Sequence, residues 1–139
     1  MLKPQQKEAI VEFARGKDVF VALPTGFGKS VIFGLLPRVF DHLKGSTGSI
    51  ACIVSPLVAL MRDLKAKFVP RGVSAEFLGE LQTDAHAITR VTRGEQQLVF
   101  VSPESILDNL ELRSMLYSTI YKESLVAIVI DEVHCIDKW

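Results

Sequence analysis

Hydrophobic residues along the chain fall into two kinds of run, which predict two kinds of element. Short continuous apolar runs, rich in β-branched and aromatic residues, favour buried strands; they cover residues 18–23, 50–54, 97–101 and 125–130, with a weaker run near 74–77. Apolar residues at helical spacing predict amphipathic helices at residues 4–15, 28–43, 57–69 and 83–93. Strands that alternate with helices indicate a parallel sheet covered on both faces, so the predicted fold class is α/β.

Polar residues and glycines follow directly after four of the predicted strands. They occupy residues 25–30, 55–56, 102–104 and 131–134. Parallel sheets of this class bind their ligands at the carboxyl ends of the strands. These four segments are therefore the candidates for a functional site.

The composition is that of one ordinary globular domain. The 139 residues carry 16 basic and 16 acidic side chains, so the formal net charge is zero and any contact with nucleic acid must be local. Cys52 and Cys135 have no partners at zinc-ligand spacing, which predicts free thiols. No apolar run has the length of a membrane span and the first residues do not resemble a secretory signal, so we expect an intracellular protein without a membrane partner.

Residues 23–30, LPTGFGKS, follow a predicted strand and open a predicted helix, which is the context of a phosphate-binding loop. The two glycines let backbone amides point at phosphate oxygens. Lys29 is expected to reach the β- and γ-phosphates, and the Ser30 hydroxyl is expected to bind Mg²⁺. Leu23 replaces the first glycine of the simplest motif, and the alternative is a glycine turn with a solvated lysine. The residues expected to contact nucleotide are Pro24, Thr25, Gly26, Phe27, Gly28, Lys29 and Ser30.

The last predicted strand runs directly into two carboxylates, and charge at the end of a buried strand is costly without a partner. Asp131 is expected to hold the magnesium ion, and Glu132 is expected to orient and deprotonate the water that attacks the γ-phosphate. These roles predict a hydrolase, whereas the alternative is a solvated turn or a helix cap. His134 has no cluster of metal-binding partners, so we expect a hydrogen-bonded histidine that links the nucleotide site to moving parts.

Five ordered blocks across the chain resemble superfamily 2 helicases, and within them the RecQ family. LKPQQKEAI resembles the leading motif of the family, which implies that Gln6 reads the adenine and that Lys3 contacts the base or the sugar. Without the other blocks, Gln6 would be interpreted as a solvated helix residue. LPTGFGKS resembles the phosphate loop of the family, with Phe27 at a tolerant position. DEVHC resembles the DEAH box, with Val133 in place of alanine.

The block VSPLVALMRDL, at residues 54–64, resembles a family motif that contacts the sugar-phosphate backbone of a single strand. The resemblance implies that Ser55, Leu57 and Arg62 are the candidates for this contact. The alternative is a plain strand-to-helix junction, in which Pro56 starts the helix and the leucines form core.

FVSPES, at residues 100–105, resembles another block on the DNA side, and Ser102 is its candidate contact. CIDKW, at residues 135–139, resembles the start of an aromatic-rich loop that couples DNA binding to ATP hydrolysis. Trp139 would then stack on a base. The alternative for Trp139 is disorder at a chain terminus.

The resemblance implies a truncated RecA-like domain, residues 1–139, of a helicase that uses ATP and Mg²⁺ and unwinds DNA in the 3′ to 5′ direction. Its expected partner is single-stranded or partly duplex DNA, in the nucleus of a eukaryote or in the cytoplasm or nucleoid of a bacterium. Family members complete the site with arginines from a second RecA-like domain, and neither its motifs nor the Ser-Ala-Thr block occur here. Such an arginine contributes about 10³- to 10⁵-fold in rate, so we expect a fragment that binds nucleotide but hydrolyses ATP very poorly.

Two other functions stay open. The first is a catalytically inactive module, such as a truncated decoy or regulator, that keeps the fold to bind nucleotide or nucleic acid. The second is a signalling ATPase whose substrate is not nucleic acid. The blocks at residues 54–64 and 100–105 count against this second function.

Overall fold

The computed structural model describes residues 3–19, 29–56, 58–79 and 82–130. Within these residues, its centre is a four-stranded sheet in which neighbouring strands are parallel and the order is β2-β3-β1-β4. The strands are β1 (Ile50–Val54), β2 (Ala75–Leu78), β3 (Leu98–Val101) and β4 (Leu125–Ile130). The predicted α/β class with a parallel sheet is confirmed.

The strands follow the apolar runs of the sequence closely. β1 and β4 match their predicted bounds, and β2 and β3 each begin one residue later than predicted. Every residue of β1, β2 and β3 is buried, as expected for a sheet with two covered faces. Of the strand predicted at 18–23, residues 20–23 lie outside the described residues.

β4 differs from the fully buried strand that its sequence predicts. It forms one edge of the described sheet, and its side chains alternate between the two faces. Ala127 is buried, whereas Ile128 is 59% exposed and Ile130 is 47% exposed. The prediction of burial is therefore wrong on one face of this strand, because at the edge of the described sheet the helices cover that face only partly.

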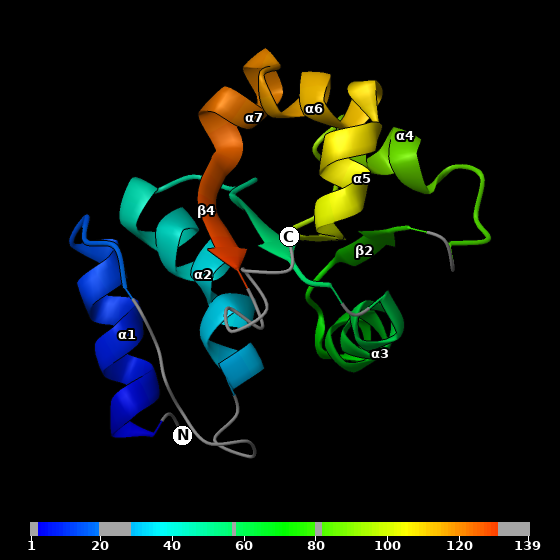
Figure 1. Cartoon of the computed structure of the whole chain (residues 1–139). Helices are drawn as coiled ribbons and strands as arrows, with labels where there is room; N and C mark the ends of the chain where they lie inside the picture. Colours follow the sequence, from blue (N-terminus) through cyan, green and yellow to red (C-terminus); the bar gives the residue numbers. More distant parts are fainter. Residues whose placement is uncertain (1–2, 20–28, 57, 80–81, 131–139) are drawn as a thin grey trace.

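One face of the sheet is covered by α2 (Lys29–Lys44) and α3 (Val58–Phe68), and α3 continues into the short 3-10 helix η1 (Val69–Arg71). Both helices contribute apolar residues at helical spacing to a core shared with the strands: Phe33, Leu36, Met61, Leu64 and Phe68. A further helix, α1 (Pro4–Ala14), packs against α2 (Figure 1). The helices predicted at 4–15, 28–43 and 57–69 are confirmed.

Four short helices cover the other face (Figure 1). They are α4 (Ala87–Thr92), α5 (Pro103–Asp108), α6 (Leu110–Leu116) and α7 (Thr119–Ser124). α4 is shorter than the predicted helix at 83–93, and the other three were not predicted because none is long enough to show a helical period. None of the described helices, on either face, is long and apolar enough to cross a lipid bilayer.

The three unpredicted helices begin at polar residues that cap them. In each case a side-chain oxygen accepts a hydrogen bond from the backbone amide three residues further on, and the capping residues are Ser102, Asn109 and Ser118. Serine and asparagine favour this position because they satisfy an amide that has no partner inside the helix. These caps were the signal in the sequence that could have located the three helices.

Tyr121 ties α7 to α4 in the core of the second face. Its hydroxyl donates a buried hydrogen bond of 2.7 Å to the backbone carbonyl of Val91. Burial raises the pKa of Tyr121, and the neighbouring Cys52 raises it further, so the hydroxyl keeps its proton at neutral pH. Burial also raises the pKa of the Cys52 thiol to about 12. Cys52 is the free, buried thiol that was predicted, and Cys135 lies outside the described residues.

Replacement of Tyr121 by phenylalanine is expected to lower the free energy of unfolding by about 1 kcal/mol, because a buried hydrogen bond is lost while the Val91 carbonyl keeps its other donor, the Gly94 amide. Chemical denaturation followed by circular dichroism measures the change. Tyr117→Phe is the matched control, since Tyr117 is 78% exposed and should alter stability by less than about 0.5 kcal/mol. Equal effects of the two substitutions would show that this hydrogen bond does not stabilise the packing of α7.

Candidate nucleotide and nucleic-acid site

The carboxyl ends of β1 and β3 bring two of the predicted nucleic-acid blocks together. Val54 pairs with Val101 in the sheet, and the amide of Ser55 donates a 2.9 Å hydrogen bond to the Val101 carbonyl. Ser55 and Ser102 therefore follow neighbouring strand ends, at the edge where sheets of this class bind ligands. Their contact with nucleic acid stays a prediction.

The predicted nucleic-acid residues differ in how accessible they are. Ser55 and Ser102 are buried. The Ser102 hydroxyl belongs to the start of α5, where its oxygen accepts the amide of Ser105 at 3.1 Å and its proton is donated to the Ser105 hydroxyl at 2.9 Å. Arg62 lies exposed on α3, where a guanidinium can reach a phosphate. Leu57 and Trp139 lie outside the described residues.

On the nucleotide side, the structure describes Lys29 and Ser30, the first two residues of the 16-residue helix α2. Lys29 is exposed and Ser30 is partly buried. The start of a helix carries the positive end of its dipole, which favours phosphate. Figure 1 shows that α2 begins at the end of the molecule toward which β4 points. The other predicted nucleotide and catalytic residues lie outside the described residues: Pro24, Thr25, Gly26, Phe27, Gly28, Asp131, Glu132 and His134.

The Ser30 hydroxyl already faces a positive charge. Its oxygen accepts a 2.6 Å hydrogen bond from the ammonium of Lys67, in the last turn of α3. Mg²⁺ prefers oxygen ligands such as this hydroxyl, and in the described structure Lys67 is the cation that faces it. The role of Ser30 as a magnesium ligand stays a prediction. Within the described ranges, no group of three or more histidine, cysteine or acidic side chains could hold a metal ion, and Asp131 is not among these residues.

Gln6 is buried in the first turn of α1, with 5% of its surface exposed. Its side-chain oxygen accepts a 2.9 Å hydrogen bond from the backbone amide of Lys3, which is itself exposed. The interpretation of Gln6 as a solvated helix residue is therefore wrong. Figure 1 shows that α1 and α2 start at the same end of the molecule. The contacts of Gln6 and Lys3 with adenosine stay predictions.

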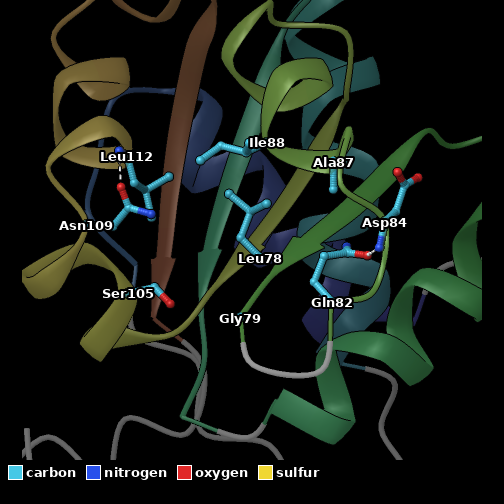
Figure 2. A pocket seen from close by; sticks show the side chains of 9 residues that line it. All are labelled: Leu78, Gly79, Gln82, Asp84, Ala87, Ile88, Ser105, Asn109 and Leu112. Atoms are coloured by element: carbon cyan, nitrogen blue, oxygen red, sulfur yellow. Dashed lines mark hydrogen bonds between the residues drawn. The ribbon is translucent and has the colours of Figure 1, made fainter.

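A pocket of about 410 Å³ opens at the carboxyl end of β2, beside α4, α5 and α6 (Figure 2). Its lining is mixed: Leu78, Gly79, Gln82, Asp84, Ala87, Ile88, Ser105, Asn109 and Leu112. Asn109 caps α6, and the Asp84 carboxylate accepts hydrogen bonds from the amide of His86 and the guanidinium of Arg90. Among the described residues that line the pocket, the one charged side chain, Asp84, is therefore already paired. The sequence did not predict it, because its lining comes from separate segments that carry no motif.

A buried carboxylate in β2 was also not predicted. Glu76 is 2% exposed, and its Oε1 accepts hydrogen bonds from Lys65 at 2.8 Å, from the Gln82 amide at 2.9 Å and from the Phe77 backbone at 3.2 Å. Its Oε2 accepts a 2.7 Å hydrogen bond from Arg90. Both oxygens are satisfied, as a buried carboxylate requires. The cluster joins α3, β2 and α4, and the one charged residue within a buried strand was its signal in the sequence.

The partners of Glu76 determine its ionisation. Burial by itself raises the pKa of this carboxyl, but the hydrogen bonds from Arg90 and Lys65 outweigh burial and hold the pKa below its ordinary value of 4.5. Arg90 binds both Glu76 and Asp84, each at 2.7 Å, and these bonds raise the pKa of the guanidinium. Glu76 and Arg90 are therefore both charged at neutral pH, and their cluster holds the segment after β2 against α4.

Comparison with known proteins gives a consistent set of relatives. The family model of DEAD/DEAH box helicases matches residues 3–139. The chain is 31% identical over 140 residues to the ATP-dependent helicase SGS1 of Saccharomyces cerevisiae and 31% identical over 137 residues to the ATP-dependent DNA helicase RecQ of Haemophilus influenzae. It is 33% identical over 138 residues to the ATP-dependent DNA helicase Q-like SIM of Arabidopsis thaliana.

These alignments cover nearly all of this chain but a small part of each relative. They include 99% of the chain for the yeast and plant proteins and 96% for the bacterial one. They include 10%, 15% and 20% of the yeast, plant and bacterial relatives, respectively. The chain thus spans between a tenth and a fifth of the length of these proteins.

Glu76→Gln is expected to lower the free energy of unfolding at neutral pH by about 2 kcal/mol, because two cations lose a buried charged partner and both are partly able to rehydrate. The folded-state pKa of Glu76 is lowered, so its charge stabilises the fold above the unfolded pKa. This contribution is lost as the pH falls through the folded pKa. The stability difference between the two proteins should therefore shrink on acidification from neutral pH to below 4.5.

Urea denaturation at a series of pH values measures this difference. Glu8→Gln is the control, because Glu8 is exposed on α1, and it should leave the stability nearly unchanged at every pH. A stability difference for Glu76→Gln that stays constant on acidification would contradict the charge-based account of the cluster.

Proposed function

Because the chain belongs to the DEAD/DEAH box helicase family, we propose that it is the ATP-binding part of a helicase that couples ATP hydrolysis to the unwinding of DNA. The relatives confirm the resemblance to RecQ-type helicases, and the parallel sheet flanked by helices agrees with the RecA-like fold of the family. One observation carries the proposal. Ser55 and Ser102 follow adjacent ends of the parallel sheet, and α2 starts with Lys29 and Ser30 at the end of the molecule toward which β4 points.

The nucleotide chemistry is assigned to the start of α2 and to the acidic residues after β4. Lys29 would neutralise charge on the β- and γ-phosphates, with the positive end of α2 behind it. Ser30 and Asp131 would hold Mg²⁺, which supplies further charge neutralisation when it is bound. Glu132 would accept the proton of the attacking water, and His134 would connect this site to moving parts.

Recognition of adenosine is assigned to the first turn of α1. Burial and the hydrogen bond from the Lys3 amide hold the Gln6 side chain in one orientation, which favours a fixed hydrogen-bonding partner such as an adenine edge. Lys3 is exposed beside it and can contact the base or sugar. Together with the loop residues 24–28, these contacts would select ATP.

Contact with the nucleic acid is assigned to the edge formed by β1 and β3. The chain has no net charge, so the proposed contacts are few and local: Ser55, Leu57, Arg62, Ser102 and Trp139. Arg62 would pair with a phosphate, and Trp139 would stack on a base. The nucleic acid would be single-stranded or partly duplex DNA, as the family function suggests.

The proposal extends to the parts of the motor that act together with this domain. A second RecA-like domain would supply arginines to the transferred phosphate, so the 139-residue chain alone should turn over ATP very slowly. Translocation from 3′ to 5′ and action in the nucleus, or in the nucleoid of a bacterium, are proposed from the family alone.

Lys29→Ala is expected to weaken ADP binding at least about tenfold, because the ammonium that faces the phosphates is removed. Isothermal titration calorimetry with ADP and Mg²⁺ on the 139-residue chain measures the affinity. Lys44→Ala is the matched control, because Lys44 is the exposed last residue of the same helix. Nucleotide affinity that is equally reduced by both substitutions, or by neither, would argue against a phosphate site at the start of α2.

The helicase proposal predicts ATP hydrolysis that depends on DNA. We expect single-stranded DNA to stimulate turnover in a longer natural product that contains this chain, Lys29→Ala to abolish this turnover, and the 139-residue chain to show almost none. A coupled ATPase assay with and without the DNA measures all three. Absence of DNA stimulation in every natural form, with nucleotide binding intact, would instead favour a catalytically inactive nucleotide-binding module.

A further inference from the structure

We propose that Lys67 is a further residue of the nucleotide site, which holds the Ser30 hydroxyl in the metal-free chain and gives up this oxygen when Mg²⁺ and nucleotide bind. The inference rests on the proposed phosphate site at the start of α2. It assigns a role to a lysine that lies outside the motifs of the sequence, 37 residues away from Ser30 along the chain.

The contact itself is short and specific. The ammonium of Lys67 lies 2.6 Å from Ser30 Oγ, at the short end of the distances found for hydrogen bonds from a charged donor. A hydroxyl oxygen that binds Mg²⁺ lies about 2.0–2.1 Å from the ion. The ion and the ammonium would therefore be close neighbours on one oxygen, and their charges would repel each other.

Three contacts on one face of α2 fix the position of Lys67. Ser30, Gly34 and Arg38 are spaced by four residues and so lie on the same side of the helix. Ser30 meets Lys67, Gly34 lies against the Phe68 ring, and the Arg38 guanidinium donates a 3.0 Å hydrogen bond to the carbonyl of Gly72. The end of α3 is thus docked along the face of α2 that begins at the phosphate site, and Lys67 is held in place rather than free in solvent.

The charge of Lys67 is not neutralised within the described part of the chain. No carboxylate among the described residues forms an ion pair with Lys67. Lys65, two residues earlier on the same helix, pairs with Glu76 instead. The ammonium lies 5.6 Å from the centre of the Phe68 ring, and a second cation, Arg71, binds the backbone carbonyl of Lys67. A cation with no countercharge among the described residues, beside a phosphate-binding helix start, attracts an anion, and the triphosphate of the proposed substrate is such an anion.

The two states of the site then differ in which cation faces Ser30. Without metal, Lys67 occupies the hydroxyl and adds its positive charge to the attraction of phosphates. When Mg²⁺ binds, the ammonium must move away from the oxygen, because the two positive charges would repel each other at such short range. Lys67 therefore supports metal-free binding of nucleotide and opposes the gain in affinity that Mg²⁺ provides.

The test measures the affinity of the 139-residue chain for ADP by isothermal titration calorimetry, once with excess Mg²⁺ and once with EDTA. The quantity of interest is the ratio of the two affinities. In Lys67→Met this ratio should rise at least about tenfold over that of the wild type, since loss of a nearby unit charge weakens phosphate binding chiefly when Mg²⁺ is absent. A purely structural defect would lower both affinities together and leave the ratio unchanged.

Two further variants make the result specific. Lys67→Arg keeps the positive charge and should retain a ratio close to that of the wild type. Lys44→Met removes an exposed cation from the far end of α2 and should leave the ratio unchanged. Circular dichroism checks that each variant is folded.

The outcomes separate this inference from the proposed function. If ADP binding depends on Lys29 but Lys67→Met leaves the ratio unchanged or lowers it, the role of Lys67 is wrong and the proposed nucleotide site stands. If Lys44→Met raises the ratio as much as Lys67→Met does, the change follows from the net charge of the chain rather than from the position of Lys67, and the inference is also wrong. If the wild type binds no ADP in either condition, both the site and the role of Lys67 are overturned.

Discussion

The close contact between α2 and α3 at Gly34 is the constraint on which the geometry of the site depends. A Cβ at this position would lie 2.3 Å from the ring of Phe68, so glycine permits a helix approach that a side chain would prevent. Phe68 also packs against Phe33, with their ring centres 6.2 Å apart, and both rings belong to the core of the sheet. Because α2 starts with the nucleotide residues and α3 starts close behind Ser55, this contact fixes the two candidate binding segments relative to each other.

A single helix thereby connects the two halves of the site. α3 exposes Arg62 near its start and directs Lys67 at Ser30 from its last turn. Lys65 on the same helix binds the buried Glu76, which anchors α3 to β2. The ion pair between Lys65 and Glu76 thus helps to hold α3 in place, although the chain as a whole has no net charge.

The sequence predicted the elements whose signal is local. β1 and β4 appeared at their observed bounds, because a continuous apolar run of five or six residues is typical of a buried strand. α2 showed more than four turns of apolar periodicity and was found readily. The motif at Lys29 and Ser30 and the blocks around Ser55 and Ser102 were visible for the same reason, since each consists of consecutive residues.

Tertiary structure alone decided which distant residues meet. The order β2-β3-β1-β4 placed Ser55 beside Val101, left one face of β4 exposed, and brought Glu76 against cations from two helices. It also brought Lys67 to Ser30. Such contacts depend on how whole elements pack, and packing is set by the summed burial of many side chains rather than by any local pattern. The sequence therefore determined the local elements and the chemistry of their ends, while only the folded chain determined which of those ends and side chains face one another.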